Sequence, residues 1–387
     1  MLTTLAVAGY RSLRELIVPL GRLNVITGAN GSGKSSVYRS LRLLAETARG
    51  GVITSLAREG GLPSTLWAGP ERFSRAMLAG DAPVEGTRRK DPVSLRLGFS
   101  GDEFGYAIDL GLPPPMPSQF TLDPVIKREC IWSGPVLRPS ALLVDRNGVA
   151  LRTRDGDGDW QTVPQPVASF DSMMTEFSDP RSAPEMITVR EQIRSWRFYD
   201  HFRTDAEAAA RLPQIGTHTP VLSNDGADLA AALQTIREIG DPTALDAAID
   251  DAFAGSQLDV ATHDGRFEVQ MRQHGLLRPL KGAELSDGTL RYLLLTAALL
   301  TPRPPALLVL NEPETSLHPD LLPALARLIA RASAHSQVLV VSHAARLIAA
   351  LEREEASQSI VLEKHFGATR IADADERELP AWKWPAR

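Results

Sequence analysis

The stretch Gly28-Ala29-Asn30-Gly31-Ser32-Gly33-Lys34-Ser35 fills every fixed position of the pattern G-x-x-x-x-G-K-[ST]. In such a loop the glycines let backbone N–H groups close around a phosphate, Lys34 reaches the β- and γ-phosphate oxygens, and the Ser35 hydroxyl can bind Mg²⁺. Residues 23–27 are typical of a short buried strand, and residues 36–48 carry apolar side chains at helical spacing, which disfavours a chance glycine-rich turn. The helix N-terminus should point at the phosphates. The sequence therefore predicts a nucleotide site made of Asn30, Gly31, Ser32, Gly33, Lys34, Ser35 and Ser36.

The composition limits the class of protein. With 387 residues, 43% of them hydrophobic, the chain can bury a large core in one large or two closely associated domains. No apolar run approaches the roughly 20 residues that span a bilayer and the first residues lack a signal-peptide pattern, so we expect a soluble cytoplasmic protein without membrane contact. Cys130 has no disulfide partner and is expected in the core. A net charge of −5 argues against a surface that coats nucleic acid indiscriminately.

The order of segments predicts an α/β fold. Residues 1–49 alternate strand-like runs with the glycine-rich loop and its helix, as at the start of a nucleotide-binding core. Residues 50–216 are rich in proline and glycine and contain short alternating segments, which predict an inserted lobe of antiparallel hairpins and helices. Residues 217–387 return to helical periodicity and buried strands, and we interpret them as the second part of the core.

Polar side chains follow two buried strands in the last third of the chain. Residues 305–310 and 338–341 are continuous apolar runs, as in parallel strands that are covered on both faces. Asn311-Glu312-Pro313-Glu314 follows the first run, and Ser342-His343 follows the second. Because ligands of open α/β sheets bind beyond the carboxyl ends of the strands, both groups should face the crevice that holds the phosphates.

Two of these residues are candidates for catalysis beside Lys34. Glu312 could orient or deprotonate the water that attacks a γ-phosphate, although a glutamate before proline is often only a solvated charge in a turn. His343 could hydrogen-bond the γ-phosphate or that water, although a lone histidine is more often a satisfied core residue. Their positions after buried strands favour the catalytic interpretation.

The stretch Glu284-Leu285-Ser286-Asp287-Gly288-Thr289-Leu290-Arg291 opens a strongly apolar helix that runs to Leu300. Ser286 or Asp287 can cap this helix, and Gly288 allows close backbone approach to a ligand. By itself the pattern favours a capped core helix. An exposed serine at a helix N-terminus is also suited to bind a phosphate.

The order of these motifs resembles the ATP-binding-cassette (ABC) superfamily, and most closely the RecF, SMC and OLD-like branch of bacterial AAA-annotated ATPases. The phrase Gly9-Tyr10-Arg11-Ser12-Leu13 also fits that branch, whereas residues 50–216 resemble it poorly. The resemblance implies a P-loop NTPase head of the ABC type, with a mixed sheet core, that binds ATP and Mg²⁺.

The resemblance also implies a role for each motif. Ser286 and Gly288 would be signature residues that contact the γ-phosphate of ATP held by a second subunit, so that a homodimer would enclose two ATP molecules. Residues 315–318 would lie at the dimer seam, and His343 would be the switch histidine. Ser35 and Asn311 would hold Mg²⁺. Gln119 is the candidate for the glutamine that links Mg²⁺ to the inserted lobe.

The chain departs from the family pattern at Asn311, where an aspartate is usual. An amide offers a neutral acceptor of similar shape in place of a charge-assisted one, so magnesium should be held less tightly. Either hydrolysis is slow, or Glu312 and Glu314 supply the missing charge.

Three further stretches receive plainer interpretations. Residues 155–159 have alternating aspartates but lack the other features of a calcium loop, which favours a hairpin tip. Residues 194–203 mix basic and aromatic side chains and are interpreted as an interface helix rather than a stacking surface for nucleic acid. Arg88-Arg89-Lys90 is interpreted as a solvated loop.

The sequence thus predicts an ATPase whose ATP-driven dimerisation delivers a conformational change to DNA or to an effector protein, with DNA repair and phage defence as candidate roles. The alternative is a slow, ATP-gated scaffold that recruits an effector. The ATPase subunit of a transporter is disfavoured by the size of the insert and by Asp287, which replaces the usual glycine.

Overall fold

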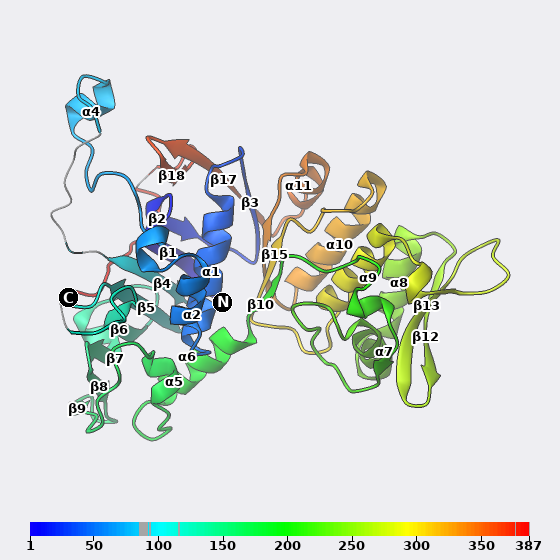
Figure 1. Ribbon diagram of the computed structural model, residues 1–387, viewed down its shortest axis with the longest axis horizontal. Helices are drawn as coiled ribbons and strands as arrows, with labels where there is room; N and C mark the ends of the chain where they lie inside the picture. Colours follow the sequence, from blue (N-terminus) through cyan, green and yellow to red (C-terminus); the bar gives the residue numbers. More distant parts are fainter. Residues whose placement is uncertain (85–91, 93, 115–116, 376, 387) are drawn as a thin grey trace. The chain divides into compact units, whose positions relative to one another are not determined.

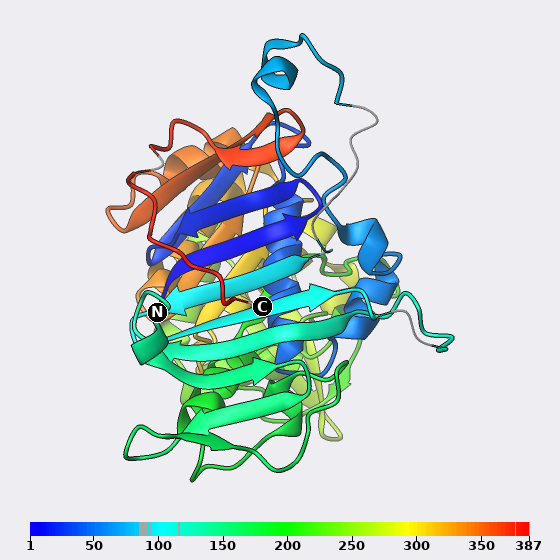
Figure 2. The ribbon, with the colours of Figure 1, turned by 90° about the vertical axis from the view of Figure 1, so that its left-hand side faces the viewer.

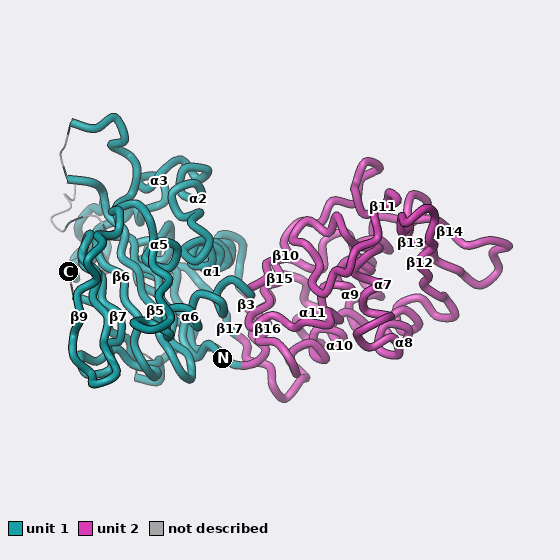
Figure 3. Tube along the Cα trace, turned by 90° about the horizontal axis from the view of Figure 1, so that it is seen from below, with its two compact units in different colours: residues 1–21, 28–195, 360–387 teal, residues 22–27, 196–359 magenta. Residues whose placement is uncertain are grey.

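The computed structural model describes residues 1–84, 92, 94–114, 117–375 and 377–386, and the chain divides into two compact units (Figures 1 and 3). Unit 1 contains residues 1–21, 28–195 and 360–387, and unit 2 contains residues 22–27 and 196–359. The basic run at residues 88–90 lies outside the described residues. The subdivision at residues 49 and 216 concerns an insertion into the core and stays a prediction. No described helix is long and apolar enough to cross a bilayer.

Unit 1 is built on an antiparallel sheet of eight strands in the order β2-β1-β4-β5-β6-β7-β8-β9 (Figure 2). From β4 onward each strand pairs with the next one along the chain, which confirms the hairpins predicted within residues 50–216. The strands are β1 (Leu2–Tyr10), β2 (Leu13–Pro19), β4 (Leu95–Gly101), β5 (Phe104–Gly111), β6 (Val125–Ser133), β7 (Leu142–Asn147), β8 (Ala150–Arg154) and β9 (Trp160–Thr162).

The two faces of this sheet are covered differently. The helices α1 (Lys34–Thr47) and α6 (Pro184–Ser195) pack on one face. On the other face, Cys130 and Trp132 pack against Trp382 and Trp384 of the carboxyl-terminal segment, which runs across the strands in red in Figure 2. Cys130 is a core residue, as predicted, and burial raises the pKa of its thiol. The remaining elements of unit 1 are α2 (Val52–Arg58), α3 (Leu62–Thr65), α4 (Arg75–Ala79), η1 (Pro139–Ala141), α5 (Met173–Glu176) and the antiparallel pair β17 (Ser357–His365, which begins in unit 2) and β18 (Ala368–Ile371).

Unit 2 contains four parallel strands in the order β10-β15-β16-β3. They are β10 (Arg197–Tyr199), β15 (Leu307–Asn311), β16 (Gln337–Val341) and β3 (Leu23–Gly28). Residues 307–310 and 338–341 are fully buried, as expected for parallel strands covered on both faces. Both predicted core strands are therefore confirmed.

Helices and a small sheet complete unit 2. α9 (Asp287–Leu299) packs against α10 (Leu322–Ser333), as Figure 1 shows, and α10 also contacts β16. The other elements are η2 (Ala209–Arg211), α7 (Leu229–Ile239), α8 (Pro242–Ala252), η3 (Gly282–Glu284), η4 (Pro319–Leu321), α11 (Ala345–Leu351) and the antiparallel strands β11 (Gln214–Ile215), β12 (Gln257–His263), β13 (Arg266–Arg272) and β14 (Leu280–Lys281).

The interface helix predicted for residues 194–203 is wrong beyond Ser195. α6 ends at that residue, and β10 follows it and pairs in parallel with β15. Pairing with this buried strand overrides the local helical preference. The aromatic side chains are all buried, which also excludes them as a surface on which bases stack: Trp196, Phe198, Tyr199 and Phe202.

The hairpin tip predicted at residues 155–159 is confirmed. These residues join β8 to β9, and Asp155 Oδ1 accepts hydrogen bonds from the backbone N–H groups of Asp157 and Asp159. The hydrogen bond from the Gln161 side chain, and then these backbone bonds, lower the pKa of the Asp155 carboxyl. The aspartates therefore shape a turn.

Candidate nucleotide site

The glycine-rich loop of unit 1 is closed on itself. Lys34 Nζ donates hydrogen bonds to the backbone oxygens of Gly28, at 2.7 Å, and Ala29, at 3.1 Å. Gly28, Gly31 and Gly33 have φ angles of 140°, 77° and 110°, a region that side-chain-bearing residues rarely adopt. The loop therefore needs glycine at these positions to turn back over the lysine.

The loop leads into the N-terminus of α1 without a side-chain cap. Gly33 is the N-cap residue and has no side chain that could accept from the first turn of the helix. Ser35 is exposed there, whereas Lys34 is only 7% exposed. Uncapped N–H groups and the helix dipole favour an anion at this end of the helix. The loop, Lys34 and Ser35 thus have the arrangement that phosphate binding requires.

Residues from both ends of the chain hold this loop in place within unit 1. Thr369 Oγ1 donates to the backbone oxygen of Ser32 at 2.7 Å and lies 2.8 Å from Ser12 Oγ. A Cβ atom on Gly33 would come within 2.1 Å of the same Thr369 oxygen. We call Ser12, Ser32 and Thr369 the loop brace. It gives a structural role to the serine of the Gly9–Leu13 phrase.

In unit 2 the parallel strands end level with one another. Asn311 of β15 pairs with Val341 of β16, and Val341 pairs with Ile26 of β3. The chain enters the glycine-rich loop two residues after Ile26. Glu312 and Ser342 are the next residues on β15 and β16, so both predicted polar groups leave the same edge of the sheet.

Glu314 joins the two polar groups. Its Oε1 atom accepts hydrogen bonds from Ser342 Oγ, His343 N and Ala344 N, at 2.7, 3.0 and 3.1 Å. Its other oxygen, Oε2, is buried and has no hydrogen-bond partner among the described residues. Glu314 therefore fixes the turn after β16 with a buried carboxyl group.

Glu312 and His343 reach outward beside this buried carboxylate. His343 Nδ1 lies 3.7 Å from Glu312 Oε1 and 3.4 Å from Glu314 Oε1. The Glu312 and His343 side chains are 45% and 57% exposed, whereas that of Glu314 is 7% exposed. Glu312 has a φ of 48°, and its backbone N–H donates to Val341 O at 2.8 Å. A strained backbone of this kind is often retained where it positions a functional side chain.

Asn311 has an acidic neighbour that the sequence did not reveal. Its Nδ2 atom donates to Asp200 Oδ1 at 2.7 Å. Asp200 follows β10, whose last residue Tyr199 pairs with Leu310 of β15. Asp200 and Asn311 are therefore the next residues on two neighbouring parallel strands.

A buried arginine of α9 ties these strand ends together. Arg291 is 3% exposed, and its Nη2 atom donates to the backbone oxygens of Asp200 and Glu312, both at 3.2 Å. Burial lowers the pKa of the guanidinium, while the carboxylates of Asp200, Glu314 and Glu312 raise it. A single cation thus faces three acidic residues.

The residues that were predicted to form the signature, Ser286 and Gly288, lie at the start of α9. Ser286 is the N-cap residue and accepts from Thr289 N at 3.1 Å, which confirms the capping role. Gly288 lies so close to the loop after β15 that a Cβ atom would meet Ser316 O at 2.9 Å. Ser286 and Gly288 line an open cavity of about 610 Å³ together with Ser316, Leu317 and His318. The structure therefore brings the signature residues next to the segment expected at a dimer seam.

A second buried arginine shapes the signature segment. Arg211 is 6% exposed and donates to the backbone oxygens of Gly282 and Leu285 and to Asp287 Oδ1, the last two at 2.6 Å. It also donates to Thr204 O at 2.8 Å. Arg211 therefore holds the chain on both sides of Ser286.

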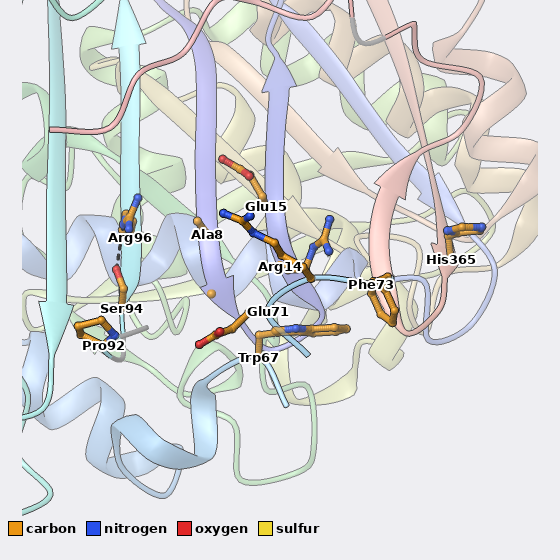
Figure 4. Close-up of a pocket in the computed structure, with 12 residues that line it drawn as sticks. Ala8, Arg14, Glu15, Trp67, Glu71, Phe73, Pro92, Ser94, Arg96 and His365 are labelled. Atoms are coloured by element: carbon orange, nitrogen blue, oxygen red, sulfur yellow. Dashed lines mark hydrogen bonds between the residues drawn. The ribbon is translucent and has the colours of Figure 1, made fainter. Parts of the chain in front are cut away.

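Two further features belong to unit 1. Gln119 is an exposed residue of the connection between β5 and β6. A cavity of about 830 Å³, shown in Figure 4, is lined by Arg14 and Glu15 of β2, Arg96 of β4, Trp67 and His365, among others. None of the predicted site residues lines it.

A family model matches residues 23–123 and 142–349, which is most of the chain. It is described as an AAA domain, putative AbiEii toxin, of a type IV toxin–antitoxin system. The chain belongs to this AAA family. The resemblance to bacterial AAA-annotated ATPases is therefore confirmed, as is the fold class of a P-loop NTPase with a mixed sheet core. No curated protein matches the sequence.

Solved structures resemble the AAA domain at low sequence identity. An SMC head domain from Thermotoga maritima is 15% identical, with a TM-score of 0.49 and coverage of 97% of this chain and 99% of that chain. An Smc head domain from Pyrococcus furiosus, bound to the C-terminal domain of ScpA, is 12% identical, with a TM-score of 0.49 and coverage of 96% and 95%. Likeness at this level says nothing of what the AAA domain itself binds.

The side chains of the AAA domain fit the Mg²⁺ that its family implies. Ser35 offers an exposed hydroxyl in unit 1, and the strand ends of unit 2 offer oxygens of Asp200, Asn311 and Glu312. No group of three His, Cys, Asp or Glu side chains forms a metal site in the described ranges. Mg²⁺ usually keeps several waters and binds through few protein ligands together with substrate phosphates, which suits the oxygens that each unit offers.

Proposed function

We propose that the protein binds ATP and Mg²⁺ and hydrolyses ATP to ADP and phosphate. Lys34 and the N–H groups of the glycine-rich loop would hold the phosphates, and Ser35 and Asn311 would face the Mg²⁺. Glu312 would orient and deprotonate the attacking water, and His343 would hydrogen-bond the γ-phosphate.

One observation carries this proposal. The ends of β15, β16 and β3 are in register, and they lead respectively into Glu312, into His343 and into the loop that contains Lys34. In open α/β sheets this edge is where ligands bind. The buried Glu314 links the first two segments directly, so the base and the histidine form a connected group rather than two isolated side chains.

The test is phosphate release measured with ATP and Mg²⁺ for the parent protein and for the Lys34→Ala and Glu312→Gln variants. We expect ATP-dependent release from the parent and none above background from either variant. A parent protein that neither binds ATP nor releases phosphate would refute the proposal.

We further propose that two copies close on two ATP molecules, with Ser286 and Gly288 of one copy contacting the γ-phosphate held by the other. Support comes from the cavity that these residues share with residues 316–318, and from the exposed serine at the N-terminus of the 13-residue helix α9. Closure would pass a conformational change to DNA or to a separate effector protein in the cytoplasm, with DNA repair or phage defence as its setting.

A second candidate is an ATP-gated scaffold that turns over slowly. Asn311 favours it, because an amide stands where the family pattern has an aspartate. The two candidates differ in one measurement: the scaffold would dimerise with ATP while releasing phosphate at the background rate.

A further inference from the structure

The side chains of Asp200 and Asn311 form a hydrogen-bonded pair across two strands. Asn311 Nδ2 donates to Asp200 Oδ1 at 2.7 Å. The pairing of β10 with β15 is parallel and in register up to Tyr199 and Leu310, so the two residues leave the sheet side by side. Both are half-buried. The sheet itself therefore places a carboxylate next to the position that lacks one.

The pair carries one negative charge, as a single aspartate would. Two carboxylates at this distance would repel each other and raise the pKa of one of them. An amide avoids this repulsion and holds the neighbouring carboxylate through a charge-assisted hydrogen bond. Asn311 is thus suited to orient Asp200.

The remaining oxygens of the pair are open to a further partner. Arg291 bonds to the backbone oxygen of Asp200, not to its carboxylate. Asp200 Oδ2 and Asn311 Oδ1 make no hydrogen bond with any described residue. Carboxylate and amide oxygens are ligands that Mg²⁺ prefers, and they accept hydrogen bonds from its bound waters.

We propose that Asp200 supplies the carboxylate that Asn311 lacks and acts as a positioning residue for the hydrated Mg²⁺ of the bound nucleotide. This inference rests on the proposed function. It adds a third explanation to the two that the sequence left open, which were slow hydrolysis and a charge supplied by Glu312 and Glu314.

The inference changes what Asn311→Asp should do. In the parent protein this change sets a second carboxylate against Asp200 and should improve Mg²⁺ binding little. In an Asp200→Asn background, Asn311→Asp restores a single carboxylate with an amide partner. The carboxylate is then at the end of β15, and the amide is after β10. The effect of Asn311→Asp should therefore be strongly non-additive with that of Asp200→Asn.

The experiment titrates Mg²⁺ into protein saturated with ATP and follows the melting temperature, a readout that does not require turnover. The four proteins of the cycle are the parent, Asp200→Asn, Asn311→Asp and the double variant. Asp259→Asn, an exposed change on β12, is the control. We expect Asp200→Asn to raise the half-saturating Mg²⁺ concentration about ten- to hundredfold, as loss of an outer ligand partner does. The half-saturating Mg²⁺ concentration of the double variant should return to within about threefold of that of the parent, and the control should have the same value as the parent.

Two outcomes would overturn the inference: an Asp200→Asn protein that titrates like the control, or an Asn311→Asp change with the same effect in both backgrounds. Should Asp200→Asn not fold, Asp200→Ser takes its place, because it also removes the charge. Failure of the proposed function looks different, since the parent would then show no stabilisation by ATP at any Mg²⁺ concentration.

Discussion

Lys34 is the residue on which nucleotide affinity should depend most. Its ammonium lies over the loop and is nearly buried, so a bound phosphate would meet a fixed charge. Lys34→Ala should weaken ATP binding by about 1.5–3 kcal/mol, the size of a hydrogen bond to a charged group, which is ten- to hundredfold or more. A fluorescent ATP analogue measures this, with Arg39→Ala, an exposed change on the same helix, as control. Tight ATP binding by Lys34→Ala would reject the phosphate-loop assignment.

Glu312 should separate binding from turnover. Its carboxylate is partly exposed, and its Oε1 atom lies 3.7 Å from His343 Nδ1. Glu312→Gln keeps the shape and removes the base, so phosphate release should fall about 10²- to 10⁴-fold while ATP affinity stays within about threefold. The ATP-bound dimer should then persist in size-exclusion chromatography. Parent-like hydrolysis by this variant would show that Glu312 is not the base.

Among the secondary-structure elements, β15 and β16 are connected by Glu314, which joins the turn after β15 to the turn after β16. Glu314→Gln replaces a carboxylate that accepts three hydrogen bonds by a neutral amide and introduces a buried NH₂ group. The free energy of unfolding should fall by about 1–3 kcal/mol, measured by urea denaturation. Glu363→Gln, which alters an exposed ion pair, serves as control. An unchanged unfolding midpoint would mean that Glu314 does not hold the turns together.

Arg211 should control the signature segment without touching the glycine-rich loop. Its guanidinium bridges several backbone oxygens and Asp287, a set that the single ammonium of lysine cannot span. Arg211→Lys should weaken ATP-dependent dimerisation, measured by light scattering, at least tenfold, which corresponds to about 1.4 kcal/mol. ATP binding by the monomer should be unchanged. Equal loss of both would indicate general unfolding of unit 2.

The elements that the sequence predicted are those with local signals. The apolar runs of β15 and β16, the loop before α1 and the cap of α9 all depend on neighbouring residues, and all three are confirmed. Asp200 was not predicted from the sequence because the strand before it, Arg197–Tyr199, has only three residues. A segment this short among aromatic residues shows no periodicity that predicts a strand. The sequence signal that could have indicated this site was an aspartate, Asp200, directly after the two aromatic residues Phe198 and Tyr199. The roles of Arg211, Arg291 and Thr369 depend on distant backbone oxygens, which no local spacing encodes.

At the scale of the whole molecule, the proposed dimer predicts complementation between two defective chains. Ser286→Arg places a bulky cation at the exposed start of α9, so it should block dimerisation and leave ATP binding by the monomer intact. Lys34→Ala should also fail to dimerise, for lack of nucleotide. Mixed together, the two chains form one site with both changes and one intact site.

Such a mixture should regain partial, ATP-dependent association in size-exclusion chromatography. Each variant alone, at the same total concentration, is the control. If both chains are folded and show no recovery on mixing, Ser286 serves only as a helix cap.

The loop brace has a consequence for how the chain is made. Its hydrogen bonds join Ser12 to Thr369, 357 residues away, and Thr369 to Ser32, 337 residues away. Contacts of such sequence separation form late, because a long loop must close first. During synthesis Ser32 of the glycine-rich loop leaves the ribosome 337 residues before Thr369, and it is secured only once that residue has been made. The loop should therefore reach its final conformation only after Thr369 has been made, so a chain that stops short of that residue would hold the loop less firmly.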